Sequence, residues 1–258
     1  MATSYETAQH ESISVARVFA LAVATIRENP VLTLGITFLF GTLPQLLINY
    51  GEGWLREARS ASTSLAILAG IFGFAALSIA VPVITQAILT RITISQSQGR
   101  KASLGESVAA AFNVALPLFG LAIVAGFGVM LGLVVLIVPG LILYVTWAVA
   151  APALVEERQG VSAALSRSAE LTDGSRWRVF GISAVLCVTG ILATLGVETI
   201  FSSPEGTDWI TDPVYILASG VATTLTSVLW GTVQTAMYVE LRAAKDGPSS
   251  SRLEEVFS

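Results

Sequence analysis

Charged side chains are scarce in this chain of 258 residues, since Asp, Glu, Lys and Arg together make up only 12% of it. A soluble domain carries about 25% charged residues, whereas here 53% of the residues are hydrophobic. Cysteine and histidine occur once each, as Cys187 and His10. This composition excludes an ordinary water-soluble fold and an intramolecular disulfide, and it leaves no basis for a Cys/His metal cluster or for Cys–His catalysis.

Motifs of soluble-enzyme chemistry are also missing, because the chain contains no P-loop, no GxGxxG and no HExxH pattern. We therefore expect a protein that is not an enzyme and that uses no metal and no cofactor. The formal net charge of −4 argues against nucleic acid as a partner.

What the chain does contain is a series of long stretches without any charged residue. Five of them exceed the ~18 residues that mark a transmembrane helix, and they cover residues 31–49, 63–90, 114–155, 179–197 and 214–239. As one helix the third stretch would measure about 63 Å, roughly twice the ~30 Å hydrocarbon core, so it must reverse. We expect the reversal at Pro139-Gly140, because Pro lacks an N–H and Gly tolerates positive φ. Its second half, 141–156, is short, which leaves a full span and a re-entrant hairpin both open.

These stretches predict an all-α membrane protein with about six transmembrane helices. We expect one polytopic helical domain over 11–245, between a disordered N-terminus, 1–10, and a disordered cytoplasmic tail, 246–258. Six spans place both termini on one side of the membrane, and all but two of the 14 Lys and Arg residues fall on that side. By the positive-inside rule this side is the cytoplasm, which makes the loop at 202–213 external.

Three segments on the predicted cytoplasmic side have the pattern of amphipathic helices that lie in the membrane interface. They cover 14–30, 103–117 and 160–174, and the second has Glu106 three residues after Ser103, as in a capping box. One interpretation is a threefold repeat of interfacial helix plus helical hairpin. The other is that short loops between membrane helices are generally amphipathic.

Several motifs follow one another in a characteristic order along the second half of the chain. They are a Pro-Gly, a Trp, a Pro, an acidic pair, Ser-Arg-Ser and Gly-x-Arg-Trp-Arg, within the segments 99–112, 137–182 and 235–247. In this combination the chain resembles the membrane domain that accompanies some glycerophosphoryl diester phosphodiesterases, and related bacterial inner-membrane proteins. The resemblance implies a multi-pass helical domain in the bacterial inner (plasma) membrane. In that group a separate soluble barrel carries the hydrolase activity, and this chain has no room for such a barrel.

Basic residues near the predicted ends of the spans are the candidate ligand-binding residues. Two arginines, Arg176 and Arg178, flank Trp177, and Arg100 with Lys101 lies on the same predicted side. Guanidinium groups bind phosphate through two hydrogen bonds, so these five residues are candidates for a lipid-headgroup site, with anionic lipid as the expected partner. The alternative is a generic interfacial anchor and topology signal.

Other polar residues in or near the spans are expected to have structural roles. We predict an ion pair between Arg91 and Glu240, with Arg178 as another partner for Glu240, because a charge one turn inside the membrane is costly unless paired. The adjacent Glu156-Glu157 is expected to be solvated or paired with Arg158. Three glutamines in different spans either line a passage or form hydrogen bonds between helices: Gln45, Gln86 and Gln234.

The motif Gly128-x-x-x-Gly132 predicts close helix packing, either within one chain or between protomers. For function, we expect a non-catalytic module that binds lipid or a lipid-derived amphiphile, as an accessory to a separate enzyme or to membrane assembly. The competing hypothesis is a small transporter or channel for an apolar or zwitterionic solute, which requires a polar route through the bundle.

Overall fold

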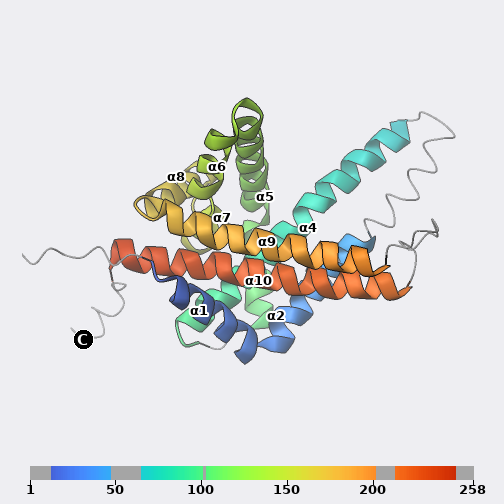
Figure 1. Ribbon diagram of the computed structural model, residues 1–258, viewed down its shortest axis with the longest axis horizontal. Helices are drawn as coiled ribbons and strands as arrows, with labels where there is room; N and C mark the ends of the chain where they lie inside the picture. The colour runs from blue at the N-terminus through green and yellow to red at the C-terminus, as the bar shows by residue number, and fades with distance from the viewer. Residues whose placement is uncertain (1–12, 48–64, 101–102, 202–212, 248–258) are drawn as a thin grey trace, which may run out of the picture.

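The computed structural model describes residues 13–47, 65–100, 103–201 and 213–247, and these ranges are helical without a strand (Figure 1). Six of the helical segments are long and apolar enough to cross a membrane, which confirms the predicted all-α multi-pass fold. These segments are Pro30–Leu47, Ala69–Ser97, Gly105–Val135, Ile137–Glu157, Arg176–Phe201 and Pro213–Asp246. The predicted disordered ends, 1–10 and most of 246–258, lie outside the described residues.

Helix α1 (Val15–Glu28) is the first predicted amphipathic helix. Ser14 caps it by accepting a hydrogen bond from the backbone N–H of Arg17 at 3.4 Å. Its buried residues, Val18, Ala22 and Thr25, lie on one face at helical spacing. The chain then enters the first candidate span through α2 (Pro30–Ile36) and the π-helical turn η1 (Thr37–Thr42).

The second predicted amphipathic helix is not a separate element. Residues Leu104–Val135 form one continuous helix, α5, which passes through Pro117, and the Ser103 side chain forms no cap hydrogen bond. Buried residues on both sides of Pro117, such as Val114 and Leu118, pack into the same core, which keeps the helix intact across the proline. The third amphipathic segment does form its own helix, α8 (Val161–Thr172). A strict threefold repeat is therefore wrong for the middle unit.

The reversal inside the long apolar stretch falls at Leu136 and not at the predicted Pro139-Gly140. Leu136 is extended, with φ −158° and ψ 138°, between α5 and α6 (Ile137–Thr146). Pro139 lies in the first turn of α6, where a missing N–H costs no helix bond. Gly140 does not form the turn. It allows α6 to pack closely against α5, because a Cβ there would lie 2.5 Å from the backbone nitrogen of Leu133.

The remaining long helices are α4 (Leu65–Ser97), α9 (Arg176–Phe201) and α10 (Pro213–Asp246), with the short α7 (Ala150–Glu157) completing the fourth span. Helix α10 is central, since it contacts α1, α4, α8 and α9. Figure 1 shows α9 and α10 side by side, while α4 and the α5–α6 hairpin point away from this pair in different directions. Asp246, predicted to begin a disordered tail, is the last residue of α10.

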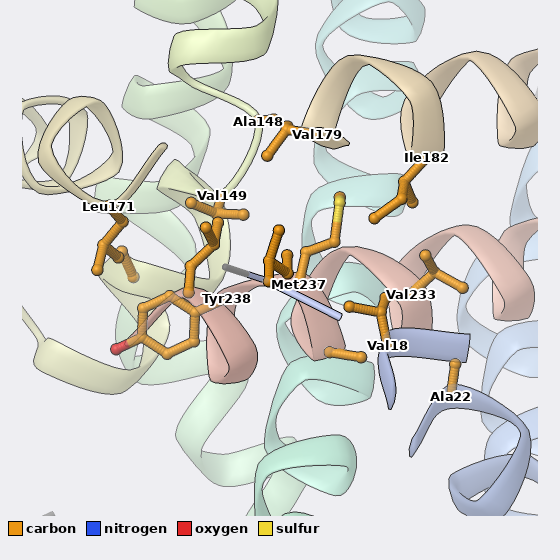
Figure 2. Close-up of a cluster of buried hydrophobic side chains, with 14 of the residues drawn as sticks. Val18, Ala22, Ala148, Val149, Leu171, Val179, Ile182, Val233, Met237 and Tyr238 are labelled. Atoms are coloured by element: carbon orange, nitrogen blue, oxygen red, sulfur yellow. The ribbon is translucent and has the colours of Figure 1, made fainter. Parts of the chain in front are cut away.

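Buried side chains gather where these helices converge. Figure 2 shows Met237 of α10 near Val18 of α1 and Ile182 of α9, while Tyr238 lies beside Leu171 and Val149. A second cluster joins α4, α5, α7 and α8. Hydroxyl pairs add polar contacts across the same region, as between Thr90 and Thr235, whose oxygens are 3.2 Å apart. We call this convergent part of the bundle the ion-paired end, for the contacts described next.

Candidate functional site

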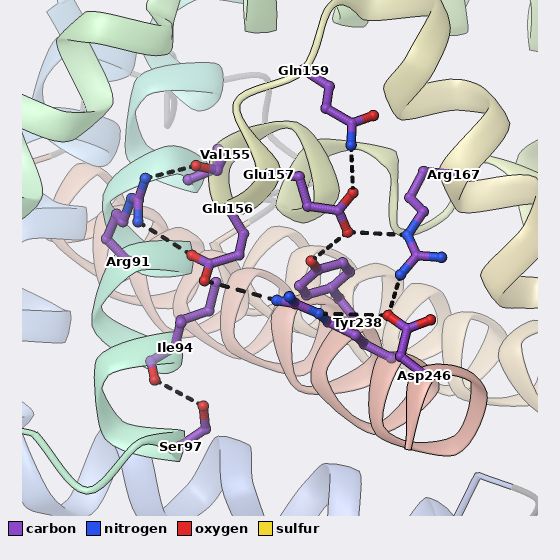
Figure 3. Close-up of polar contacts among 11 residues, drawn as sticks. Arg91, Ile94, Ser97, Val155, Glu156, Glu157, Gln159, Arg167, Tyr238 and Asp246 are labelled. Atoms are coloured by element: carbon purple, nitrogen blue, oxygen red, sulfur yellow. Dashed lines mark hydrogen bonds and ion pairs between the residues drawn. The ribbon is translucent and has the colours of Figure 1, made fainter. Parts of the chain in front are cut away.

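Charged side chains from four helices meet at the ion-paired end (Figure 3). Glu156, near the end of α7, contacts Arg91 of α4 at 3.2 Å and Arg242 of α10 at 3.9 Å. Its neighbour Glu157 contacts Arg167 of α8 at 3.1 Å and accepts a hydrogen bond from the Tyr238 hydroxyl at 2.9 Å. Together these contacts tie the ends of α4, α7, α8 and α10 to one another.

The predicted ion pair between Arg91 and Glu240 is wrong. Arg91 binds Glu156 and also donates to the backbone carbonyl of Val155 at 2.7 Å, whereas Glu240 pairs with Arg17 of α1 at 3.1 Å. The prediction considered only the ends of long spans. It omitted α1 as a source of partners. It also expected Glu156 to be solvated or paired with Arg158, whereas that side chain is 18% exposed and pairs with Arg91 and Arg242.

Arg167 links α8 to two further carboxylates, Glu157 and Asp246. Burial by itself lowers the pKa of Arg167, but the hydrogen bonds to Glu157 and Asp246 outweigh burial, so this pKa is raised above its ordinary value. The guanidinium therefore stays charged, and each carboxylate keeps its partner. No group of three or more potential metal ligands was found in the described ranges.

The structure does not assemble the predicted basic rim into one site. Arg178 donates to the carbonyl of Ile13, just before the start of α1. Arg100 lies just after the end of α4, and Gln96 near that end contacts Glu28, the last residue of α1. Those contacts lie about 21 Å apart, the length of a 14-residue helix. Arg176 pairs with Asp173 at 3.3 Å, and Trp177 is 86% exposed. Lys101 lies outside the described residues.

The fourth span is broken near its middle, between α6 and α7. Residues 147–149 form turns, and side chains from other helices satisfy the backbone groups that this break releases. The Ser168 hydroxyl donates to the carbonyl of Thr146 at 2.8 Å and accepts from the N–H of Val149 at 3.3 Å. The Gln234 amide donates to the carbonyl of Ala148 at 2.5 Å. Such breaks are tolerated at membrane depth where the protein itself provides partners.

A partly open cavity of about 440 Å³ lies beside this break, lined by α5, α6, α9 and α10. Aromatic and aliphatic side chains dominate its lining, with Trp147 and Trp230 from two sides. Polar atoms enter at a few points only, from Tyr144, Ser183 and Gln234. We call it the first cavity.

A second cavity, of about 390 Å³, lies between η1, α4 and α10 and has more polar lining residues, including Gln45, Thr85 and Ser227. Trp230 lines both cavities. Gln86, from the second cavity, donates to Gln234, from the first cavity, at 2.9 Å. The glutamines therefore combine both predicted roles, because they bond between helices and line cavities, but the cavities form no single continuous passage.

The predicted glycine motif packs inside one chain. A Cβ on Gly128 would lie 2.6 Å from the Trp147 ring, and a Cβ on Gly132 would lie 2.9 Å from the Gly140 backbone. Both glycines thus bring α6 against α5 and place Trp147 at the first cavity. The break at 147–149 lies just before Pro152, because proline leaves the carbonyl of residue 148 without a helix partner.

Comparison with known proteins gives one match. No curated protein and no solved structure matches the chain. Residues 13–241, which include both cavities and all of the ion-paired end except Arg242 and Asp246, match a family described only as a domain of unknown function. The resemblance to the membrane domain of glycerophosphoryl diester phosphodiesterases stays a prediction beside this match. The chain belongs to the family of the DUF7847 domain.

Proposed function

We propose that this multi-pass membrane protein binds a lipid-like amphiphile and does so without catalysis. The observation that carries the proposal is the first cavity, which lies inside the apolar part of the bundle. Its volume of about 440 Å³ falls within the range of roughly 300–1,000 Å³ that is usual for ligand sites. The predicted headgroup site at the rim does not support the proposal, because Arg100 and Arg178 lie apart.

The lining of the first cavity favours a ligand that is largely apolar and has no net charge where it is held. Two indole rings and the side chains of Met130, Leu133 and Met237 provide apolar contact. Among the described lining residues there is no Asp, Glu, Lys or Arg, so a group with net charge would lack a counter-charge there. Gln234 and Ser183 offer hydrogen bonds, as an ester or hydroxyl group of an amphiphile requires.

Native mass spectrometry of the detergent-purified protein tests this proposal, with added phosphatidylethanolamine as the probe. Ala125 lines the cavity, and Ala125→Phe should fill it and reduce the retained lipid about tenfold, which corresponds to about 1.4 kcal/mol. Val124→Phe is the matched control, because Val124 is 48% exposed and does not line the cavity. Ser183→Leu provides a second way to fill the cavity if Ala125→Phe fails to fold. Equal retention by all four proteins would contradict the proposal.

We further infer a bacterial inner-membrane location with both termini in the cytoplasm, supported by the distribution of Lys and Arg. In a Cys187→Ala background, Gln98→Cys marks the loop after α4 and Leu136→Cys marks the hairpin tip. An impermeant thiol reagent added to intact cells should label Leu136→Cys and leave Gln98→Cys unlabelled. The opposite result would invert the topology, and protection of both positions would favour a re-entrant hairpin.

A further inference from the structure

Three cavities follow a single face of α10. Six of the residues of α10 that line them recur at helical spacing of three and four: Ser219, Thr223, Thr226, Trp230, Gln234 and Met237. Ala222 and Ser227, each next to a member of this series, line the cavities as well. Tyr215 begins the series one turn earlier. From Tyr215 to Met237 the helix measures about 33 Å, which is comparable with the ~30 Å hydrocarbon core. We call this face the lane.

The cavities are stacked in order along the lane and share their boundary residues. The third cavity, of about 60 Å³ between α9 and α10, shares Thr223 and Thr226 with the second cavity. The second cavity shares Trp230 with the first. A ligand that moves along α10 therefore meets one boundary of small hydroxyl side chains and one boundary formed by an indole.

The indole boundary is closed in this structure. The Gln86–Gln234 hydrogen bond joins α4 to α10 beside Trp230, and Gly231 allows the two helices to come this close. A Cβ on Gly231 would lie 2.6 Å from Leu89 and 2.9 Å from the Gln86 amide oxygen. Opening this boundary requires that one uncharged hydrogen bond breaks and one ring rotates, which is a small change in a membrane interior.

The chemistry of the lane suits a polar group without net charge. Threonine, serine and glutamine side chains provide donors and acceptors along its length, and Glu198, at the third cavity, is the only charged residue among those that line the three cavities. A bare ion would meet no counter-charge over most of this path. A zwitterionic headgroup carries both signs and can use neutral hydrogen-bonding groups for each.

We propose that the lane carries the headgroup of a zwitterionic phospholipid from one leaflet to the other while its acyl chains stay in the bilayer between the diverging helices. This inference rests on the proposed function, since it takes the lipid bound at the first cavity as the molecule that moves. Trp230 and the Gln86–Gln234 bond act as the barrier between the two halves of the path.

Vesicles of phosphatidylcholine with a trace of headgroup-labelled fluorescent phosphatidylethanolamine, with and without the full-length protein, test the inference. Dithionite added outside bleaches only the outer leaflet of protein-free vesicles, so bleaching of the inner pool reports transfer. We expect the protein to expose the inner pool, and the double variant Thr226→Leu/Ser227→Leu to slow this about tenfold. Trp230→Ala should accelerate transfer. Leu225→Ala is the control with unchanged rate, because Leu225 is 55% exposed and lines none of the cavities.

A soluble fluorophore trapped in the vesicles is the control that excludes simple entry of dithionite. Two outcomes overturn the inference. One is that wild-type protein leaves the inner pool protected, and the other is that the double variant transfers lipid as fast as wild type. If lipid retention in native mass spectrometry persists in either case, the proposed function stands and only the lane fails. If retention is also absent, the proposed function fails with it.

Discussion

The two ends of the helix bundle are held in different ways. At the ion-paired end, carboxylates and guanidiniums from α4, α7, α8 and α10 contact one another, and the neighbouring side chains are buried. At the opposite end, which we call the splayed end, apolar side chains face outward, as with Phe72, Val134 and Ile200, each more than 70% exposed. Figure 1 shows the helices converging at the first end and spreading at the second.

This difference shows what joins helices when the surrounding solvent is lipid. Apolar side chains gain little by leaving lipid for protein, so hydrophobic burial does not drive the helices together there. Hydrogen bonds, ion pairs and close glycine contacts provide the attraction instead. The splayed end lacks ion pairs in the described residues, and its helices lie further apart (Figure 1). The cavities begin at the edge of the buried core, where Met237 lines the first of them.

Removing Glu157 should damage the ion-paired end most. Glu157→Ala leaves Arg167 and the Tyr238 hydroxyl without a shared acceptor. Because the pair is partly exposed and Arg167 keeps Asp246, we expect a cost below the roughly 3–5 kcal/mol of a fully buried pair. Thermal unfolding in detergent should show a clear drop in Tm. Glu170→Ala is the control, since Glu170 is 69% exposed and contacts the same Arg167 at 3.6 Å. A control that lost as much Tm as Glu157→Ala would mean that burial of the carboxylate is not what matters.

A methyl group at the hairpin should disturb the tight contact between α5 and α6. Gly140→Ala puts a Cβ 2.5 Å from the Leu133 backbone nitrogen, and overpacking of this kind costs about 1–3 kcal/mol. Gly126→Ala, on α5 with no atom within 4 Å of its Cβ, should be neutral or stabilising. Unfolding in detergent compares the two variants. Equal stability would show that α5 and α6 are less closely packed than the structure indicates.

Loss of the Ser168 hydroxyl should loosen the broken fourth span. Ser168→Ala leaves the Thr146 carbonyl with only the longer 3.3 Å contact from Thr172 and leaves the Val149 N–H unpaired. An unsatisfied buried group costs about 1–3 kcal/mol, and hydrogen exchange at 146–150 should accelerate. The exposed Ser166 on the same helix offers Ser166→Ala as a control with unchanged exchange. Equal protection from hydrogen exchange at 146–150 in both variants would show that the Ser168 hydroxyl on α8 does not stabilise the break.

The smallest effect is expected for the glutamine pair. A double-mutant cycle with Gln86→Leu and Gln234→Leu should give a coupling of about 0.6 kcal/mol, the average for hydrogen bonds between membrane helices. Unfolding by a denaturing detergent in mixed micelles measures it. A coupling above about 2 kcal/mol would exceed the usual maximum, and the barrier in the lane would then be harder to open than proposed.

Composition and periodicity were sufficient to predict the spans and the helices α1 and α8, because burial in lipid and amphipathic spacing are local properties of the sequence. Partners were harder to predict. The choice of Glu156 over Glu240 for Arg91 depends on how α7 sits against α4, and no local pattern contains that information. The predicted position of the reversal, Pro139, was wrong by three residues, because proline fits the start of a helix as readily as a turn.

The broken fourth span has a consequence for the order in which the protein is made. The Ala148 carbonyl depends on Gln234, which lies 86 positions later in the chain. At a synthesis rate of about 5–20 residues per second, roughly 4–17 s separate the two residues on the ribosome. Through that interval the Ala148 carbonyl has no helix partner, because Pro152 has no N–H, and it must bond to water or to another group. The final shape of the fourth span is thus imposed late, by the last helix to enter the membrane.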